Sequence, residues 1–263
     1  MQLTVLGSGT AVPHPKRASS AYWLQTSEAA VLLDFSVFAL GRIMTKGFEW
    51  ANMDAIWISH FHLDHIGGLP AFLFGSRHAE EMKGRKKPLR IFGGTGLKAL
   101  LKGYSGLNNY KLLDQPFPLE IIEVEPLEKF EIAPGLEAVA LKTPHTEESL
   151  AIHLRERDGS TLVYTSDTGF TETLAAFARR VGLLVIEASF PHNNPTEDHL
   201  ELAEAMYVIR KAEPKLAVLT HLYPYWDEID FGCEVAKFSP MAEVVQAFDG
   251  LKLVVPPKAK TEE

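Results

Sequence analysis

The stretch "ISHFHLDHIGGLP", from Ile58 to Pro70, decides how the rest of the sequence is interpreted. Four side chains that bind metals well fall close together in it: His60, His62, Asp64 and His65. Alternate residues of a strand share a face, so the first two histidines can point the same way, and a turn that begins near Leu63 swings the other two ligands to a neighbouring point. This arrangement suits two metal ions better than one.

A metal site needs more ligands than one loop offers, and three further candidates each follow an apolar run. They are His145 in "LKTPHTEES", Asp167 in "LVYTSDTGF" and His221 in "LAVLTHLYP". Each stands at the carboxyl end of an expected strand, which is where functional residues collect in α/β folds. We therefore expect these three residues to join the first four.

Length and composition favour one domain. The chain has 263 residues, 46% of them hydrophobic, and no repeat or low-complexity segment, so we expect one domain over residues 1–257 and a disordered tail at residues 258–263. The first residues show no basic lead, and no apolar run approaches the roughly 20 residues that a membrane span needs. The expected protein is cytoplasmic, with no membrane partner.

Cysteine and charge restrict the chemistry. A single cysteine, Cys233, cannot supply a thiolate zinc cage, so any metal is held by nitrogen and oxygen. The net charge of −8 argues against nonspecific nucleic-acid binding, which depends on Lys and Arg contacts with phosphates. The basic run "KGRKKPLR", Lys83 to Arg90, is the local exception, read either as a solvated loop or as a phosphate-binding patch.

The expected elements come in blocks. Short apolar runs predict strands near Leu3, Ala21, Ala30 and Ala55, and a set of apolar runs from Leu119 to Thr165 resembles a meander. Helices are expected at Val37–Lys46, Thr171–Arg180 and Asp198–Ala212. Because strict βαβ alternation is lacking, the sequence predicts an α/β fold with two sheets face to face and helices outside.

The chain resembles the metallo-β-lactamase-fold hydrolases, in the branch that contains ribonuclease Z and related phosphodiesterases. The resemblance is carried by the His60-x-His62-x-Asp64-His65 motif, His145, Asp167 in "SDTG" and His221, and also by "LGSGTAVP" and by "LLDF" around Asp34. It implies a four-layer αβ/βα sandwich, with two mixed sheets flanked by helices.

The resemblance also implies two metal sites. His60, His62 and His145 would hold one ion, Asp64, His65 and His221 the other, and Asp167 would bridge them. Zinc is the first expectation for imidazole and carboxylate ligands, and manganese or iron suit the same set. Two ions that share one water make hydroxide available near neutral pH, which predicts hydrolysis of an ester-type bond. Asp64 is also a candidate to take a proton during attack.

Two residues outside the ligand set indicate a phosphodiester. In "VIEASFPHNNPTEDHLELAEAM", Glu187 ends a strand and His199 opens a helix, which resembles the ribonuclease Z segment whose His faces the scissile phosphate. His199 is therefore the candidate general acid, with Glu187 beside it. The alternative is that His199 is only a first-turn residue next to an N-cap at Asp198. Leu200-Glu201 replaces the usual Ser-Thr of that branch.

The substrate is expected to be small. Ribonuclease Z carries a long arm between its third His and its bridging Asp, whereas the segment from His145 to Asp167 fits only a hairpin turning at Asp158-Gly159. The expected substrate is therefore a small or nucleotide-like phosphodiester rather than transfer RNA. An RNA endonuclease and a carboxylic ester or lactone hydrolase are the alternatives. A noncatalytic scaffold usually loses ligands, whereas all seven are present, and a homodimer is compatible with the sequence.

Residues near the ends of the chain are candidates to line the pocket. Tyr223, Tyr225 and Trp226 follow His221 closely, and they either wall the substrate or simply pack. His14, in the N-terminal loop, has two readings of equal weight, pocket lining and loop surface.

Overall fold

Strands that are apolar on both faces build the centre of the molecule. In β4 (Ala55–Ile58), Ala55 and Trp57 pack between the two sheets, whereas Ile56 and Ile58 pack against helices. Side chains alternate along a strand, so a run that is apolar throughout is stable only where both faces are covered. The computed structural model describes residues 1–194 and 196–255, and the expected tail at residues 258–263 lies outside the described residues.

The strands form two seven-stranded mixed sheets. The first sheet has the order β14 (Lys252–Val254), β1 (Gln2–Gly7), β2 (Ala21–Gln25), β3 (Ala30–Leu33), β4, β5 (Leu89–Gly93) and β6 (Leu119–Glu123). The second has the order β13 (Glu243–Gln246), β12 (Leu216–Thr220), β11 (Leu183–Glu187), β10 (Thr161–Tyr164), β9 (Leu150–Glu156), β8 (Leu136–Lys142) and β7 (Lys129–Ala133).

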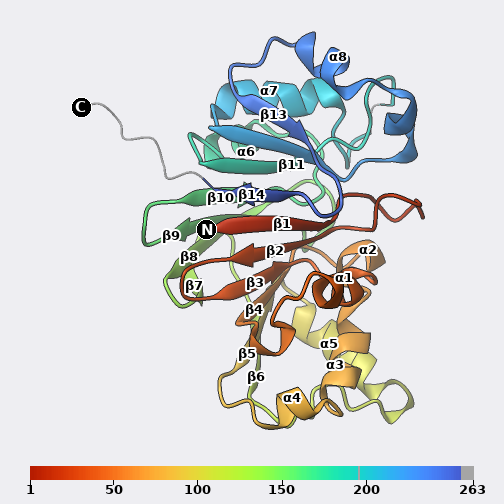
Figure 1. Ribbon diagram of the computed structural model, residues 1–263, viewed down its shortest axis with the longest axis vertical. Coiled ribbons are helices and arrows are strands. Elements are labelled where there is room, and N and C mark those ends of the chain that lie inside the picture. The colour runs from red at the N-terminus through yellow and green to blue at the C-terminus, as the bar shows by residue number, and fades with distance from the viewer. Residues whose placement is uncertain (195, 256–263) are drawn as a thin grey trace.

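Helices cover the outer faces of both sheets (Figure 1). On the side of the first sheet lie α1 (Ala39–Thr45), η1 (Trp50–Asn52), α2 (Leu63–Ile66), α3 (Leu69–Ser76), α4 (Glu80–Lys83), α5 (Leu97–Gly106) and η2 (Leu107–Asn109). On the side of the second lie α6 (Glu172–Phe177), α7 (Leu202–Ala212), η3 (Pro224–Glu228) and α8 (Phe231–Ala236). The four-layer sandwich predicted from the sequence is confirmed.

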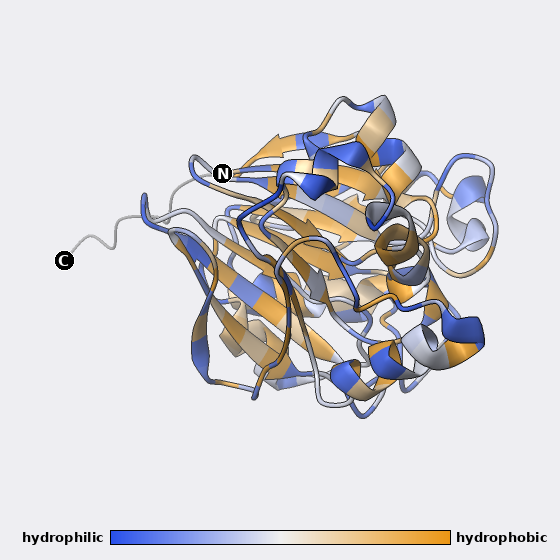
Figure 2. Cartoon of the chain, turned by 90° about the horizontal axis from the view of Figure 1, so that it is seen from below, coloured by the Kyte–Doolittle hydropathy of each residue, from blue (hydrophilic) through white to orange (hydrophobic). Residues whose placement is uncertain are grey.

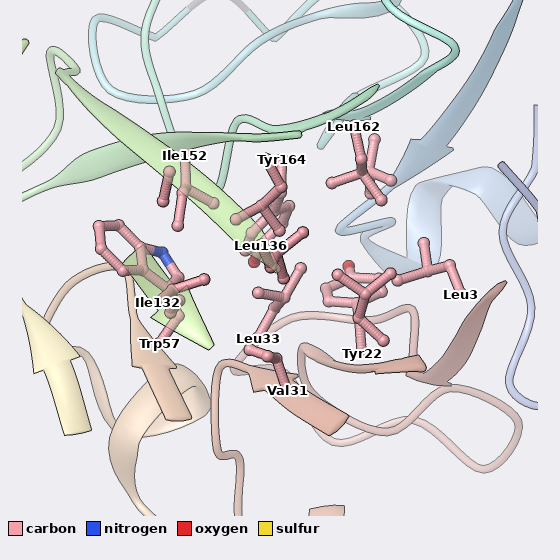
Figure 3. Close-up of a cluster of buried hydrophobic side chains, with 14 of the residues drawn as sticks. Leu3, Tyr22, Val31, Leu33, Trp57, Ile132, Leu136, Ile152, Leu162 and Tyr164 are labelled. Atoms are coloured by element: carbon pink, nitrogen blue, oxygen red, sulfur yellow. The ribbon is translucent and has the colours of Figure 1, made fainter. Parts of the chain in front are cut away.

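The main core lies between the sheets. Figure 3 shows Leu33 and Trp57 of the first sheet facing Ile132 and Ile152 of the second, and the cluster they belong to is buried throughout. Seen from below, the strands are predominantly hydrophobic, whereas several of the covering helices mix hydrophilic and hydrophobic residues (Figure 2). This core fixes the two sheets against each other and so fixes the loops at their strand ends.

The fold corrects two sequence predictions and adds elements that the sequence did not predict. The run at Leu119–Val124 is not part of the meander, because β6 pairs in parallel with β5 at the edge of the first sheet. The strands β7, β13 and β14 and the helices α4 and α8 were not predicted. The helix expected from Asp198 begins at Leu202, because Glu201 caps it in a capping box with Glu204.

No helix among residues 1–194 and 196–255 is long and apolar enough to cross a membrane.

Candidate metal centre

All seven predicted ligands meet where strand ends of the two sheets come together. The first sheet supplies four of them through the loop after β4 and helix α2, which runs from Leu63 to Ile66. The second sheet supplies the other three, from segments that follow β8, β10 and β12: His145, Asp167 and His221. The structure therefore brings together side chains that are up to 161 positions apart in the sequence, His60 and His221.

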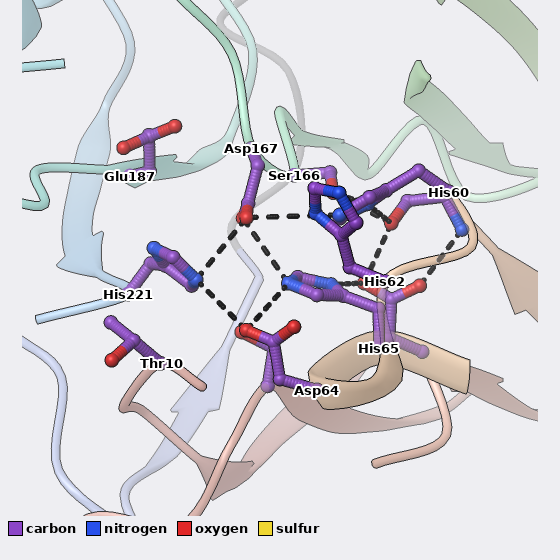
Figure 4. Close-up of polar contacts among 12 residues, drawn as sticks. Thr10, His60, His62, Asp64, His65, Ser166, Asp167, Glu187 and His221 are labelled. Carbon is purple, nitrogen blue, oxygen red and sulfur yellow. Dashed lines mark hydrogen bonds and ion pairs between the residues drawn. The ribbon is translucent and has the colours of Figure 1, made fainter. Parts of the chain in front are cut away.

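The ligand-type atoms form two groups that share Asp167. One group contains His60, His62, His145 and Asp167, and the other contains Asp64, His65, Asp167 and His221; within each group the atoms lie within 4.8 Å of one another. Figure 4 shows the carboxylates of Asp64 and Asp167 facing the rings of His65 and His221. Two cation sites with a shared carboxylate fit this donor set.

Asp167 contacts imidazole nitrogens of both groups. Its carboxylate lies 3.3 Å from His65 Nε2 and 3.2 Å from His221 Nε2, and 3.8 Å from the Nε2 atoms of His60 and His145. The carboxylate of Asp64 lies 3.6 Å from His65 Nε2 and 3.5 Å from His221 Nε2. The geometry thus places the two carboxylates among the imidazole rings at distances that leave space for cations between them.

Hydrogen bonds fix which nitrogen of each ring faces the centre. The Nδ1 atom of His65 lies 2.7 Å from Asp34 Oδ2, and that of His145 lies 2.8 Å from the Asp198 carbonyl. Both partners only accept, so each Nδ1 carries the hydrogen, and in the neutral ring Nε2 has the lone pair that a metal needs.

Two serines impose the same tautomer on the remaining buried rings. Ser189 Oγ donates to Glu187 at 2.6 Å and therefore accepts from His221 Nδ1 at 3.0 Å. Ser59 Oγ donates to Asp34 at 2.9 Å and therefore accepts from His60 Nδ1 at 3.1 Å. A protein partner on one nitrogen and a free lone pair on the other is the arrangement of a metal-binding histidine.

Four of the inward-facing atoms have no hydrogen-bond partner among the described residues. The Nε2 atoms of His60, His65 and His221 and the Oδ1 atom of Asp167 are buried without a hydrogen bond. Leaving a buried polar atom unpaired costs about 1–3 kcal/mol each. Four such atoms directed at one place fit a divalent cation site, and the identity of the cation does not follow from them.

Asp34 organises the floor of the site from a fully buried position. Its carboxylate accepts hydrogen bonds from the backbone and hydroxyl of Ser59, from His65 and from Tyr164, at 2.7 to 2.9 Å. The sequence showed only that "LLDF" resembles a family segment, and the acceptor role of Asp34 was not predicted. Ser59, Ser166 and Ser189, which contact the rings of His60 and His221, were not predicted either, because small hydroxyl residues carry no distinctive spacing.

The backbone holds three of these residues in the left-handed region. Asp34, Ser166 and His221 have φ values of 58°, 55° and 56°. This conformation costs non-glycine residues roughly 1–2 kcal/mol and persists only where surrounding contacts enforce it. The contacts of the centre therefore hold these three residues against local backbone preference.

Buried carboxylates and imidazole rings shift one another's pKa values at the centre. Burial opposes protonation of His65, yet the carboxylates of Asp167 and Asp34 outweigh it and raise the pKa of that ring. Burial likewise acts to raise the pKa of Asp167, but His221 and His65 hold the pKa of Asp167 well below its usual range. Burial and the neighbouring His65 lower the pKa of His60. The carboxylate of Asp167 therefore stays ionised and faces the position that a cation held by the rings would occupy.

His199 lies beside the two groups and is held by Glu187. Its Nδ1 atom lies 3.2 Å from Glu187 Oε1, and its ring stacks on His221 with centroids 5.3 Å apart. Although burial opposes protonation, the hydrogen bond to Glu187 raises the pKa of His199 to about 9. Glu187 is itself almost fully buried and also accepts from Thr168 and Leu200 backbone amides.

The reading of His199 as a first-turn helix residue is wrong. Helix α7 begins three residues later, and Asp198 does not cap it; instead its carbonyl accepts the hydrogen bond from His145. His199 therefore stands on a loop at the centre rather than on a helix.

Aromatic residues line one flank of the site. Phe190 stacks on Tyr223 with centroids 4.8 Å apart, and Tyr225 lies 5.8 Å from Phe190 with 64% of its surface exposed. Burial, followed by the charge of Asp167, raises the pKa of Tyr223 to about 12. Trp226 is not part of this flank, since it is buried and donates to the Ala188 carbonyl. Phe190 was not singled out from the sequence.

Known proteins are similar to this chain in sequence. The chain is 31% identical over 157 residues to a ribonuclease Z of Picrophilus torridus, an alignment that covers 60% of this chain and 48% of that protein. It is 26% identical over 235 residues to the probable metallo-hydrolase YhfI of Bacillus subtilis, covering 84% of this chain and 87% of that one.

Solved structures agree on the fold. The metallo-β-lactamase-fold protein YhfI of Bacillus subtilis superposes with a TM-score of 0.79 at 22% identity, covering 96% of this chain and 98% of that chain. The short form of human tRNase Z gives a TM-score of 0.79 at 21% identity, covering 97% and 100%. The chain thus has the metallo-β-lactamase fold and is related to metallo-hydrolases.

A family model narrows this relationship. The model of the anti-Pycsar protein Apyc1 matches residues 1–241, which is most of the chain and includes every residue of the candidate centre. On that match, this chain belongs to the family of the anti-Pycsar protein Apyc1.

Proposed function

We propose that this protein is a metal-dependent phosphodiesterase that uses two divalent cations, with zinc as the first candidate, to hydrolyse a small or nucleotide-like phosphodiester. The observation that carries the proposal is His199, held by buried Glu187 and stacked on His221 at the edge of the two ligand groups. A metal site alone suits any ester, whereas a proton donor beside it serves a poor leaving group.

Divalent cations bound there would lower the pKa of water and withdraw charge from the attacked phosphoryl oxygens. The residues of the chain have separate tasks around them. Asp64, whose carboxylate faces His65 and His221, would take the proton released during attack. His199 would donate a proton to the leaving oxygen, and Glu187 would orient the ring that does so.

A small substrate is favoured over transfer RNA by the segment between His145 and Asp167. That segment forms the β9–β10 hairpin, which turns at Asp158-Gly159 with Thr161 paired to Arg155, and leaves no room for an arm. The relationship to a ribonuclease Z supports a phosphodiester bond, and the short hairpin supports a compact substrate.

The basic run at Lys83–Arg90 is largely engaged in local contacts. Arg85 is buried and donates to the carbonyls of Ala51, Met53 and Pro88, and Lys87 pairs with Asp54 at 2.9 Å. These contacts argue against a phosphate-binding patch and favour the loop reading, except that Arg85 is buried rather than solvated.

The test compares a chromogenic phosphodiester with a chromogenic carboxylic ester and a lactone, on metal-loaded protein. We expect cleavage of the diester, with loss of activity in Asp64→Ala. His199→Ala should lose activity on diesters with an alkoxide leaving group and much less on the chromogenic one. Small nucleotide diesters and a transfer RNA precursor follow as second substrates. Cleavage of the carboxylic ester alone, unaffected by His199→Ala, would contradict the proposal, and cleavage of the RNA alone would support the endonuclease alternative.

A further inference from the structure

Three polar side chains join two segments that flank the centre. The N-terminal loop, residues 8–18, connects β1 to β2 and projects beside the ends of these strands (Figure 1). The aromatic segment, residues 222–228, follows His221 and includes Tyr223 and Tyr225. Neither segment supplies a residue of the two ligand groups.

The contact between them is short and has a defined direction. His14 Nδ1 accepts from the backbone amides of Lys16 and Arg17, at 3.3 and 3.2 Å. Its Nε2 must therefore carry a hydrogen, which it donates to Asp227 Oδ2 at 2.6 Å. Arg17 donates to the other oxygen of Asp227, also at 2.6 Å.

The side chains of His14 and Arg17 are largely buried, whereas the carboxylate of Asp227 is partly exposed to solvent. The side chains of His14 and Arg17 are 7% and 10% exposed, against 42% for Asp227. Arg17 also donates to the carbonyl of Tyr223 at 3.5 Å. The group thus reaches the backbone of the aromatic flank directly.

The base of the N-terminal loop is held independently. Asp249 accepts from the backbone and hydroxyl of Ser8 and from the backbone of Ala18, so both ends of the loop are tied to one carboxylate. The Leu222 amide also donates to the Ser8 carbonyl at 3.0 Å, so the base of the loop meets the aromatic segment without the contact at Asp227. Figure 4 places Thr10, on the same loop, beside Asp64 and His221.

We propose that His14, Arg17 and Asp227 form a positioning latch that holds the tip of the N-terminal loop against the aromatic segment and so sets the shape of the substrate-facing wall. The inference rests on the proposed function for its substrate. The latch residues do not touch the ligand groups, so they act on binding of the diester and not on the bond that breaks.

The first test is a split between KM and kcat for the chromogenic phosphodiester. Asp227→Asn and His14→Ala should raise KM by roughly tenfold, because the substrate must then order the wall when it binds. The kcat of both variants should stay within about twofold of the wild-type value. His14→Gln, which keeps a donor at the position of Nε2, should restore KM. Asp230→Asn is the matched control, because Asp230 lies three residues away and caps α8 without touching the latch.

The second test needs no substrate. Hydrogen exchange of metal-loaded protein should rise in both residues 8–18 and residues 222–228 in Asp227→Asn, and in neither segment in Asp230→Asn. The metal content should stay equal to that of the wild type.

The outcomes separate the latch from the proposed function. Failure of the wild type to cleave any phosphodiester overturns the function, whereas the exchange result still decides the latch. Unchanged exchange in both segments, or faster exchange with unchanged KM, overturns the positioning role. A fall in kcat with constant KM also overturns it, because the group would then act on catalysis.

Discussion

At the scale of single residues, the centre depends on partners that are not ligands. Each of the four histidines His60, His65, His145 and His221 gives its Nδ1 hydrogen to a protein acceptor and directs Nε2 inward. The acceptors are one carboxylate, one carbonyl and two serines that are themselves committed as donors. Orientation of the ligands is thus a property of the buried hydrogen-bond network.

Asp34→Asn tests this network. Asparagine tolerates the left-handed backbone at this position, but its amide puts a donor where His65, Tyr164 and Ser59 need an acceptor. We expect metal affinity to fall about 10- to 100-fold, measured by metal content after dialysis against a weak chelator. Asp54→Asn is the control, since Asp54 is also a buried carboxylate beside the first sheet, but its side chain bonds to Ala30 and Lys87 and not to a ligand. Equal metal loss in both variants would refute the role of Asp34.

His199→Ala tests the proton donor. A substrate with an alkoxide leaving group needs protonation and should lose roughly 10²- to 10⁴-fold in kcat. A p-nitrophenolate leaving group is stable as an anion, so its kcat should fall much less. The ratio of the two losses is the measured quantity, and equal losses for both leaving groups would show that His199 acts only on structure.

At the scale of elements, three loops of the centre meet at one glycine. Gly169 donates its amide to the Pro144 carbonyl at 2.6 Å, and a Cβ on it would come within 1.8 Å of the Glu197 carbonyl oxygen. It thereby packs the loop of Asp167 against the loops of His145 and His199. Only the absence of a side chain permits this approach.

Gly169→Ala should therefore separate the loop of His199 from the ligands. We expect lower kcat together with a lower melting temperature, because the backbone at residue 197 has to move. Gly103→Ala, in the middle of α5 with open space around its Cβ, should instead stabilise the protein by roughly 0.5–1 kcal/mol. Thermal unfolding and the diester assay decide both, and an unaffected Gly169→Ala variant would contradict the packing argument.

The elements also show what sequence reasoning could reach. Strands β4, β10 and β12 were predictable because both of their faces are buried and their apolar runs are continuous. Strands β13 and β14 were not, because they lie at sheet edges and are half exposed. The start of α7 was misplaced because two acidic residues compete for the N-cap, and Asp198 is held by His145 while Glu201 gains the capping box.

At the scale of the whole molecule, the centre lies across the seam between the two sheets. Four predicted ligands come from the first sheet and three from the second, so a bound cation crosslinks both halves of the sandwich. Their positions at the ends of expected strands, together with the family resemblance, predicted which residues would meet. The latch and the contacts of Asp34 could not be predicted, because they join distant residues that have no shared pattern.

Removal of metal should lower the stability of the whole fold. A cation that binds only the folded state stabilises it by about 2.7 kcal/mol at a hundredfold excess over Kd. We expect a chelator to lower the melting temperature of the wild type, and to have no effect on Asp167→Ala, whose shared carboxylate is missing. If the chelator leaves the melting temperature of the wild type unchanged, the centre is not a metal site.

The most direct test of the central claim is the number of metal ions per chain, measured by elemental analysis on wild type, His145→Ala and His221→Ala. The two groups of side chains predict two ions in the wild type and one in each variant, because each substitution removes a ligand from a different group. A single ion in the wild type, or two ions retained in both variants, would contradict the two-cation centre on which the proposed function rests.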